Sequence, residues 1–190
     1  MGFARIAGTD EAGRGPLAGP VVSAAVILPP AFSDSRITDS KKLTPKKREL
    51  LYDLISAHAD SIGIGIVESG EIDRINILQA SLKSMHLAVL QLSPPPDYLL
   101  IDGKFTISFC NLPQEAVIRG DSLSISIAAA SIIAKVTRDR LMMQYHETYP
   151  QYGFGVHKGY PTKAHRDAVA KFGPCPIHRI SFRGVREYVR

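Results

Sequence analysis

Short apolar runs alternate along the chain with longer segments in which an apolar residue recurs every three or four positions. These two patterns predict strands and helices respectively. The runs that predict strands cover residues 3–7, 21–28, 62–67, 98–101, 105–109 and 115–118. The segments that predict helices cover residues 44–58, 71–92, 124–146 and 163–172. Strands followed by alternating helices and strands are typical of an α/β fold with a mixed central sheet flanked by helices.

Local signals refine these boundaries. Thr44 followed by Pro45 is a typical helix start. The helix that follows is expected to turn four apolar residues inward: Leu50, Leu51, Leu54 and Ile55. Glycine alternates with larger apolar residues in 62–67, which predicts a strand in close contact with another backbone. Asp121 or Ser122 is expected to cap the longest predicted helix.

Two adjacent carboxylates, Asp10 and Glu11, follow the first apolar run, and Gly13 and Gly15 come soon after them. Glycine has no Cβ, so the backbone there can approach another molecule closely. Adjacent residues of a strand point to opposite faces of the sheet. We therefore expect the strand to end at the acidic pair, so that Glu11 can swing round or offer its carbonyl oxygen to the ligand of Asp10.

The formal net charge is +5, and it is unevenly distributed. Residues 1–134 carry 12 Lys/Arg and 14 Asp/Glu, whereas residues 135–190 carry 11 and 4. A basic C-terminal third joined to a core that bears acids favours a polyanionic partner. The length of 190 residues suits one domain. The last forty residues are basic and interrupted by prolines, which predicts a small helical extension of that domain.

Cysteine content and hydropathy bear on location. Cys110 and Cys175 are too few for a disulfide framework and lack the spacing of metal ligands, which favours a reducing cytoplasm. No apolar run reaches the roughly 18 residues that span a bilayer. The start of the chain also lacks the pattern of a secretory signal. We expect a cytoplasmic protein with no membrane partner.

Asp10, Glu11, Asp102 and Asp121 share a context, because each lies at the end of a predicted strand or the start of a predicted helix. Strand ends are where sites assemble in open α/β sheets. Carboxylates brought together repel one another unless cations neutralise them. Oxygen ligands favour Mg²⁺ or Mn²⁺, and two such ions can activate a water and stabilise the leaving oxygen of a phosphodiester.

Six motifs extend the acidic pair into an ordered series over nearly the whole chain. They are DEAGRGPLAGPV at 10–21, SKKL at 40–43, IDG at 101–103, GDS at 120–122, residues 129–139, and HKGY at 157–160. Together they resemble the motifs of the type 2 ribonucleases H (ribonuclease HII). The resemblance implies a ribonuclease H-like catalytic domain over residues 1–150, with residues 151–190 as a basic extension packed on it.

The resemblance also assigns roles. It implies that Asp10, Glu11, Asp102 and Asp121 are the catalytic acids and hold two Mn²⁺ or Mg²⁺ ions, with Asp10 as the central ligand. Residues expected to bind substrate are Gly13, Arg14, Gly15, Lys41, Lys42, Lys158 and Tyr160. The main chain of the glycine pair would touch the 2′-hydroxyl, Tyr160 would stack on the adjoining sugar, and the lysines, with Lys163, would contact phosphates.

The reaction implied is hydrolysis of the phosphodiester on the 5′ side of a ribonucleotide, leaving a 3′-hydroxyl and a 5′-phosphate. The substrates would be RNA–DNA hybrids and duplex DNA with embedded ribonucleotides, and we expect a monomer. Type 3 enzymes carry an additional N-terminal domain and usually a small residue in place of Arg14. Because Asp10 lies so near the start, we expect no such domain here.

Other interpretations of the same residues are less consistent with the chain. Gly120-Asp121-Ser122-Leu123 spells a serine esterase signature, but none of the eleven aspartates has a histidine three residues later, as that family requires. A nucleic-acid binder without catalysis would account for the basic third but not for the acids. The glycine spacing is one residue too long for a dinucleotide loop. Asp139 is a possible fifth acid, but its helical spacing from Lys135 favours an ion pair.

Overall fold

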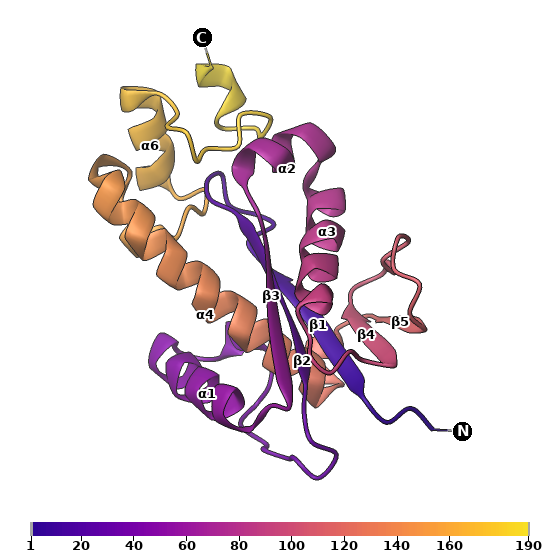
Figure 1. Cartoon of the computed structure of the whole chain (residues 1–190). Helices are drawn as coiled ribbons and strands as arrows, with labels where there is room; N and C mark the ends of the chain where they lie inside the picture. The colour runs from indigo at the N-terminus through magenta and orange to yellow at the C-terminus, as the bar shows by residue number, and fades with distance from the viewer. Residues whose placement is uncertain (1, 190) are drawn as a thin grey trace.

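The computed structural model describes residues 2–189 and is built around one five-stranded sheet of order β3-β2-β1-β4-β5 (Figure 1). The strands are β1 (Ile6–Ala12), β2 (Val21–Ile27), β3 (Ser61–Val67), β4 (Tyr98–Asp102) and β5 (Gln114–Val117). β1 pairs antiparallel with β2 and parallel with β4, while β2–β3 is antiparallel and β4–β5 parallel. The predicted mixed α/β sheet is confirmed.

Helices cover both faces of this sheet. They are α1 (Pro45–His58), α2 (Ser69–Ile75), α3 (Ile77–Leu90), α4 (Ile125–Thr148), α5 (Phe154–His157) and α6 (Lys163–Phe172). Single turns of 3₁₀ helix occur at η1 (Ser40–Lys42), η2 (Gly120–Ser122), η3 (Pro150–Tyr152) and η4 (Arg186–Tyr188). Ala24 and Val26 of β2 pack in the cluster of α1 and α4, whereas Ala25 and Ile27 pack in the cluster of α3. Alternate positions of one strand therefore serve opposite layers.

Small residues allow the helices to approach the sheet closely. A Cβ on Gly63 or Gly65 of β3 would lie within 2.0 Å of a backbone oxygen of α3, and one on Gly8 would strike the backbone at Ser126. The predicted close contact of residues 62–67 is thus confirmed, and its partner is α3. On the opposite face, the start of α4 lies directly against β1. Residues of α4 therefore lie beside the acids of β1.

Helix α1 begins as the sequence predicts, with the hydroxyl of Thr44 accepting a hydrogen bond from the N–H of Lys47 at 3.3 Å. Leu51 and Ile55 are buried. The inward orientation expected for Leu50 is wrong, since its side chain is 63% exposed. Leu50 lies about 100° around the helix from Leu51 and faces away from the sheet.

Three further predictions about helices and strands are wrong. Residues 71–92 form two helices, because Asn76 takes a φ of 67° and ends α2. Its side-chain oxygen then accepts hydrogen bonds from the N–H groups of Leu78 and Gln79 and caps α3. Residues 105–109 form no strand. Asp121 and Ser122 do not cap the longest helix either, because they lie in η2 and the residue before α4 is Ser124.

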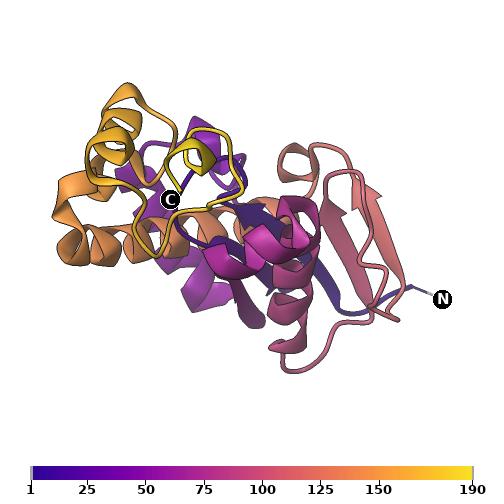
Figure 2. The same cartoon turned by 90° about the horizontal axis from the view of Figure 1, so that it is seen from above.

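Residues after α4 fold back onto the sheet's end. In both views α6 and the C-terminal tail lie at the end of the molecule where β1 leads into the following loop (Figures 1 and 2). Ala18 of that loop forms an isolated β-bridge with His178 of the tail. Met142 of α4, Tyr152 and Phe154 form a buried cluster beneath it. The division at residue 150 into domain and extension stays a prediction.

Two more observations concern the cysteines and the hydropathy of the helices. Cys110 and Cys175 are both free thiols. None of the helices formed by residues 2–189 combines the length and the apolar character needed to cross a bilayer.

Candidate active site

The acids of the candidate site lie along one edge of the sheet. Thr9 of β1 pairs in parallel with Ile101 of β4, so the next residues, Asp10 and Asp102, lie at the same level of neighbouring strands. The N–H of Gly120 donates to Oδ1 of Asp102 at 2.7 Å and joins η2 to the end of β4. Asp121, the next residue, is thereby brought to the same edge.

The expected strand end at Asp10 and Glu11 is wrong. β1 continues through Ala12, with Glu11 paired to Ser23 of β2. The two acids therefore project to opposite faces. Asp10 is 3% exposed against α4, whereas Glu11 is half-buried on the other face, 3.5 Å from the guanidinium of Arg14. The antiparallel partner β2 holds the strand extended here, a constraint that the local sequence does not reveal.

Burial and mutual repulsion perturb these carboxyls. Burial, followed by the charges of Glu11 and Asp102, raises the pKa of Asp10 well above its usual value. A hydrogen bond of 2.7 Å from the N–H of Glu11 opposes this shift. Burial also raises the pKa of Glu11 to about 7 against the lowering effect of Arg14. The pKa of Asp121 is raised by burial and then by Asp39 and Asp102.

The ammonium of Lys41 lies within electrostatic reach of several of these acids. Its ammonium loses some solvent contact, which lowers its pKa, but the charges of four carboxylates outweigh that effect and raise the pKa overall. The four carboxylates belong to Asp10, Asp39, Asp121 and Asp102. Asp39 was missed by the sequence analysis. Its place directly before SKKL was a usable signal, because its side chain caps η1 by accepting from the N–H of Lys41 at 2.9 Å.

The donor set fits a hard divalent cation by its chemistry. The side-chain donors are carboxylate oxygens, and burial, together with mutual repulsion, raises the pKa values of Asp10, Glu11 and Asp121; a bound cation would relieve that repulsion. As the side chains stand, no three His, Cys, Asp or Glu residues within 2–189 lie close enough together to hold one ion. The site is thus a set of neighbouring acids rather than a closed cage.

The glycine loop lies beside Tyr160. Gly13 has a φ of 104°, and a Cβ there would lie 2.2 Å from Nε of Arg138. A Cβ on Gly15 would lie 3.8 Å from the ring of Tyr160. The Tyr160 side chain is 40% exposed, as expected for a residue that meets a ligand. Loop and tyrosine are joined by the Leu17 N–H, which donates to the carbonyl of Gly159 at 2.8 Å.

A chain of imidazoles supports Tyr160 from the protein side. The N–H of Cys175 donates to Nδ1 of His178 at 2.9 Å, so the proton of that ring lies on Nε2. His178 Nε2 then donates to Nε2 of His165 at 3.0 Å, and His165 Nδ1 donates to the carbonyl of Tyr160 at 3.0 Å. Both imidazoles are neutral in this arrangement, and burial lowers their pKa values to about 4.

Two buried arginines support the loop, and the sequence analysis identified neither. Arg138 of α4 donates to the carbonyls of Ala18, Pro20 and Lys158 at 2.9–3.0 Å. Arg179 of the tail donates to carbonyls of the same loop. A buried arginine that binds only carbonyls leaves no signal in a single sequence, because its partners are main-chain atoms.

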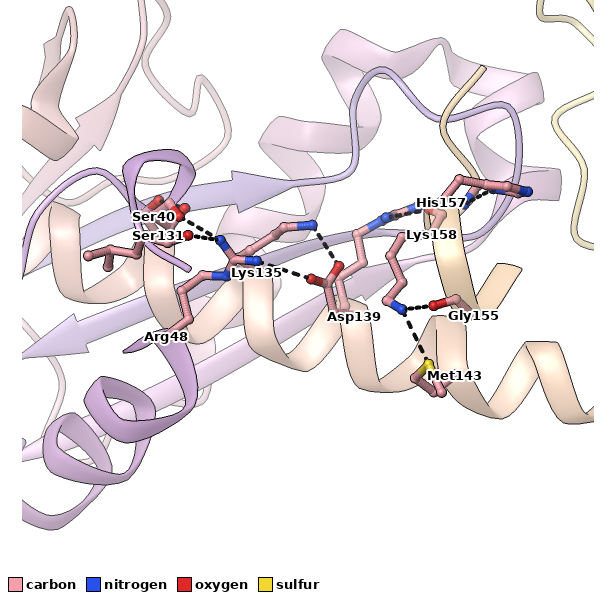
Figure 3. Close-up of polar contacts among 12 residues, drawn as sticks. Ser40, Arg48, Ser131, Lys135, Asp139, Met143, Gly155, His157 and Lys158 are labelled. Atoms are coloured by element: carbon pink, nitrogen blue, oxygen red, sulfur yellow. Dashed lines mark hydrogen bonds and ion pairs between the residues drawn. The ribbon is translucent and has the colours of Figure 1, made fainter. Parts of the chain in front are cut away.

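A row of polar contacts lies along α4, between that helix and the segments packed on it (Figure 3). The hydroxyls of Ser40 and Ser131 are 2.8 Å apart. Further along, Lys135 donates to Asp139 at 2.6 Å, which confirms the predicted ion pair, and Arg48 approaches the same carboxylate at 3.9 Å.

Beyond this ion pair lies an open hollow that Tyr160 also lines. Lys158 lines it as well, and its ammonium donates to the carbonyl of Gly155 and lies 3.2 Å from the sulfur of Met143 (Figure 3). Lys42 is exposed beside Lys41 in η1, whereas Lys163 pairs with Asp167 of its own helix at 2.8 Å. The lysines thus fall in different places, and only some border the acids or the hollow.

The esterase interpretation of Gly120-Asp121-Ser122-Leu123 is excluded by the contacts of the serine. Ser122 lies in η2, where its hydroxyl donates to Asp121 at 3.4 Å. No histidine contacts this hydroxyl within the described part of the chain.

Comparisons with known proteins agree on one family. A sequence model of the ribonuclease HII family matches residues 7–185. Ribonuclease HII of Geobacter metallireducens is 60% identical over 188 residues, which cover 99% of this chain and 88% of that protein. Ribonuclease HII of Geotalea uraniireducens is 60% identical over 190 residues, covering 100% and 88%.

Solved structures agree as well. Ribonuclease H2 of Pyrococcus horikoshii superposes with a TM-score of 0.80 at 27% identity over 97% of this chain and 96% of that one. The RNase HII of Archaeoglobus fulgidus, solved with PCNA, gives 0.79 at 25% identity over 94% and 95%. A Bst-RNase HIII solved with Mn²⁺ gives 0.74 at 17% identity over 99% and 70%, a likeness of fold alone.

Proposed function

The chain belongs to the ribonuclease HII family and is a ribonuclease H endonuclease, and on this premise we propose its substrates, products and site residues. It hydrolyses the phosphodiester on the 5′ side of a ribonucleotide and leaves a 3′-hydroxyl and a 5′-phosphate. The substrates are RNA–DNA hybrids and duplex DNA with embedded ribonucleotides. The observation that carries this proposal is that the edge bearing Asp10, Asp102 and Asp121 adjoins the loop beside Tyr160.

The acids Asp10, Glu11, Asp102 and Asp121 hold the divalent ions. Two Mn²⁺ or Mg²⁺ ions bound there supply water activation and neutralise charge at the leaving oxygen. Because Glu11 projects from the opposite face of β1, its carbonyl oxygen is the group that can share a ligand with Asp10. The raised pKa values of Asp10 and Asp121 in the absence of cations support their assignment. Bst-RNase HIII, which shares the fold, was solved in complex with Mn²⁺ and lends further support to a divalent ion.

The loop and the lysines select and hold the substrate. The main chain of Gly13, Arg14 and Gly15 meets the 2′-hydroxyl, because the two glycines let the backbone approach a ribose closely. Tyr160 stacks on the adjoining sugar. Lys41, Lys42 and Lys158 contact phosphates, with Lys41 nearest to the reacting one because it lies among the acids. We place the enzyme in the cytoplasm as a monomer.

The direct test is cleavage of a labelled DNA duplex that contains one ribonucleotide, in Mg²⁺, in Mn²⁺ and in EDTA. The expected result is a cut immediately 5′ of the ribonucleotide that requires metal and is absent from the all-DNA control. Equal cutting of the control would replace the proposal with a DNA nuclease. Salt-sensitive binding without any cutting would indicate a binding protein on the same fold.

A further inference from the structure

Arg179 is fully buried, and every hydrogen bond of its guanidinium goes to a main-chain carbonyl. Nε donates to Gly19 at 3.0 Å and Nη1 to Arg14 at 3.0 Å. Nη2 donates to Gly13 at 2.6 Å and to Gly19 at 2.9 Å. No carboxylate of residues 2–189 forms an ion pair with it. One side chain from the end of the chain therefore holds both ends of the glycine loop.

The main chain around Arg179 fixes where its side chain points. Its own N–H donates to the carbonyl of Leu17 at 2.8 Å, and the N–H of Gly19 donates to the carbonyl of Ile177 at 2.8 Å. Together with the bridge of Ala18 to His178, these bonds align the tail with the loop. The side chain of Arg179 therefore extends from a segment whose main chain is hydrogen-bonded to the loop, which fixes the direction of the guanidinium.

Such a group is costly to bury. The guanidinium loses its hydration without a carboxylate in direct contact, and four hydrogen bonds to carbonyl dipoles and the more distant charge of Asp73 offset that loss only in part. Burial and the nearby charge of Arg138 accordingly lower the pKa of Arg179 to about 9. A neutral residue of similar volume would fill the same space at lower cost. The contribution of the arginine is therefore the orientation that it imposes on three peptide groups.

This orientation decides which atoms the loop offers to a ligand. The carbonyls of Gly13 and Arg14 point inward to Arg179. The N–H groups of Arg14 and Gly15 donate to no atom within the described chain, and both residues are exposed. Gly15 also adjoins the ring of Tyr160. Two neighbouring free donors on an exposed turn suit an oxygen acceptor such as a ribose hydroxyl.

We propose that Arg179 is a positioning residue for ribonucleotide selection: by holding the carbonyls of Gly13, Arg14 and Gly19 inward, it presents the N–H groups of Arg14 and Gly15 to the 2′-hydroxyl. This inference rests on the proposed function, because it presupposes that the loop reads the sugar. It differs from a purely structural role in that it predicts a change in selectivity. It also specifies the contact with the 2′-hydroxyl, which is made by main-chain N–H donors of the loop.

The test compares Arg179→Lys and Arg179→Met with the unaltered chain. Lysine retains a charge but cannot reach three carbonyls at once, and methionine fills the space without a donor. The measured quantity is the inhibition constant of an all-DNA duplex divided by the KM of the same duplex with one ribonucleotide. Neither constant depends on the fraction of enzyme that is folded, so simple destabilisation leaves the ratio unchanged.

The expected result is a fall in this ratio of roughly tenfold or more in both variants, the scale of losing one to two hydrogen bonds to the sugar. A matched control is Met85→Ala, which opens a cavity in the core on the α3 face, away from the loop. It should lower the melting temperature and leave the ratio as it is. The unaltered chain tests the proposed function separately, because a ratio near one would show that no sugar is read.

An unchanged ratio in the Arg179 variants, with a selective unaltered chain, would overturn the inference and leave the proposed function standing. If neither variant can be purified, amide hydrogen exchange of the unaltered chain decides. The hydrogen-bonded amides of Leu17 and Gly19 should then be protected to the same degree as the amide of Arg179, since the two segments open together. A loop that exchanges freely beside a protected tail would refute the clamp.

Discussion

At the scale of single residues, the buried carboxyl of Asp10 is both the centre of the candidate site and a source of instability. It lies against α4 with Glu11 and Asp102 nearby, and burial disfavours its charged form. A group placed in this way serves a ligand rather than the fold, because an uncharged residue would be tolerated better there.

Asp10→Asn should therefore separate activity from stability. We expect cleavage to fall by about a hundredfold or more, because an amide is a poor ligand for a hard cation. We expect the melting temperature in EDTA at neutral pH to rise, because the cost of burying a charge and the repulsion with Glu11 and Asp102 are removed. Cleavage assays and calorimetry measure the two effects. Appreciable residual cleavage, or a large loss of stability, would contradict the assignment.

Tyr160 offers a second prediction at this scale. Tyr160→Ala should reduce cleavage at a lone ribonucleotide by roughly tenfold or more, since base or sugar stacking on an aromatic ring is worth about 1–3 kcal/mol. Tyr160→Phe preserves the ring beside Gly15 and should retain most of the rate. Comparison of kcat/KM for the three proteins makes the measurement. An unchanged rate in the alanine variant would reduce Tyr160 to a packing residue.

The sequence predicts the positions of some site residues but not of others. The acids could be predicted because they follow apolar strands, and the loop could be predicted from its glycines. The path of Glu11 could not, because it depends on pairing with Ser23 of another strand. Arg138 and Arg179 could not either, because arginine is normally exposed and nothing local marks these two for burial.

At the scale of elements, the break between α2 and α3 shows where periodicity misleads. The apolar spacing continues across Asn76, so the pattern predicts one helix. The positive φ of Asn76 and its two side-chain hydrogen bonds start a second helix in a new direction. Asparagine tolerates this conformation better than most residues, which is a weak signal beside a strong apolar repeat.

Asn76→Ala tests this junction. Loss of the cap should lower the free energy of unfolding by about 1–2 kcal/mol, with a further cost because alanine disfavours a positive φ. Asn76→Gly removes the cap but accepts the φ of 67°, so it should cost less. Denaturant unfolding of the three proteins measures the difference. Equal stability of all three would mean that the cap contributes nothing.

The imidazole chain from the tail to Tyr160 predicts a dependence on pH. His165 and His178 stay neutral in the folded protein down to a pKa of about 4, whereas unfolded histidine titrates near 6.5. At these two sites the unfolded state therefore binds more protons between these values, and their contribution to the free energy of unfolding should fall as the pH drops from about 6.5 to about 4. The raised pKa values of Asp10 and Glu11 act in the opposite direction, so the histidine contribution is isolated by comparison with a variant. The melting temperature measured across that interval makes the test.

The matched variant is His165→Gln, whose amide cannot titrate. Its melting temperature should decline less steeply over the same interval than that of the unaltered chain. Parallel slopes for the two proteins would show that the acid sensitivity arises elsewhere.

At the scale of the whole molecule, acidic and basic residues occupy different parts of the chain. The acids gather at one edge of the sheet, while residues 135–190 carry 11 Lys/Arg and 4 Asp/Glu. On the proposed function, a duplex would be attracted by the basic part and would meet the acids where bound cations neutralise them. The sequence predicted this division from composition, and it predicted the sheet and most helices from apolar spacing. It could not predict that the tail would lie on the loop, because the contact joins nearly opposite ends of the chain.

Duplex affinity should accordingly fall with salt, and Lys42→Gln should weaken binding while reducing the slope of log affinity against log salt by about one. Lys83→Gln is the control, because Lys83 pairs with Glu71 on the α3 face. Binding measured in EDTA over a range of salt concentrations makes the comparison. Identical slopes for the two variants would remove Lys42 from the phosphate contacts.

The bond from the tail to the glycine loop has a consequence for how the protein is made. Synthesis proceeds from the N-terminus, so the strands that carry Asp10, Glu11 and Asp102 are made before the tail. Arg179, which holds Gly13 and Arg14 in place, is synthesised after all five strands and after helices α1 to α6. A nascent or prematurely terminated chain thus possesses the acids without an ordered loop. On the proposed role of Arg179, a chain that stops before residue 179 would therefore carry the acids of the candidate site but would lack selectivity for ribonucleotides.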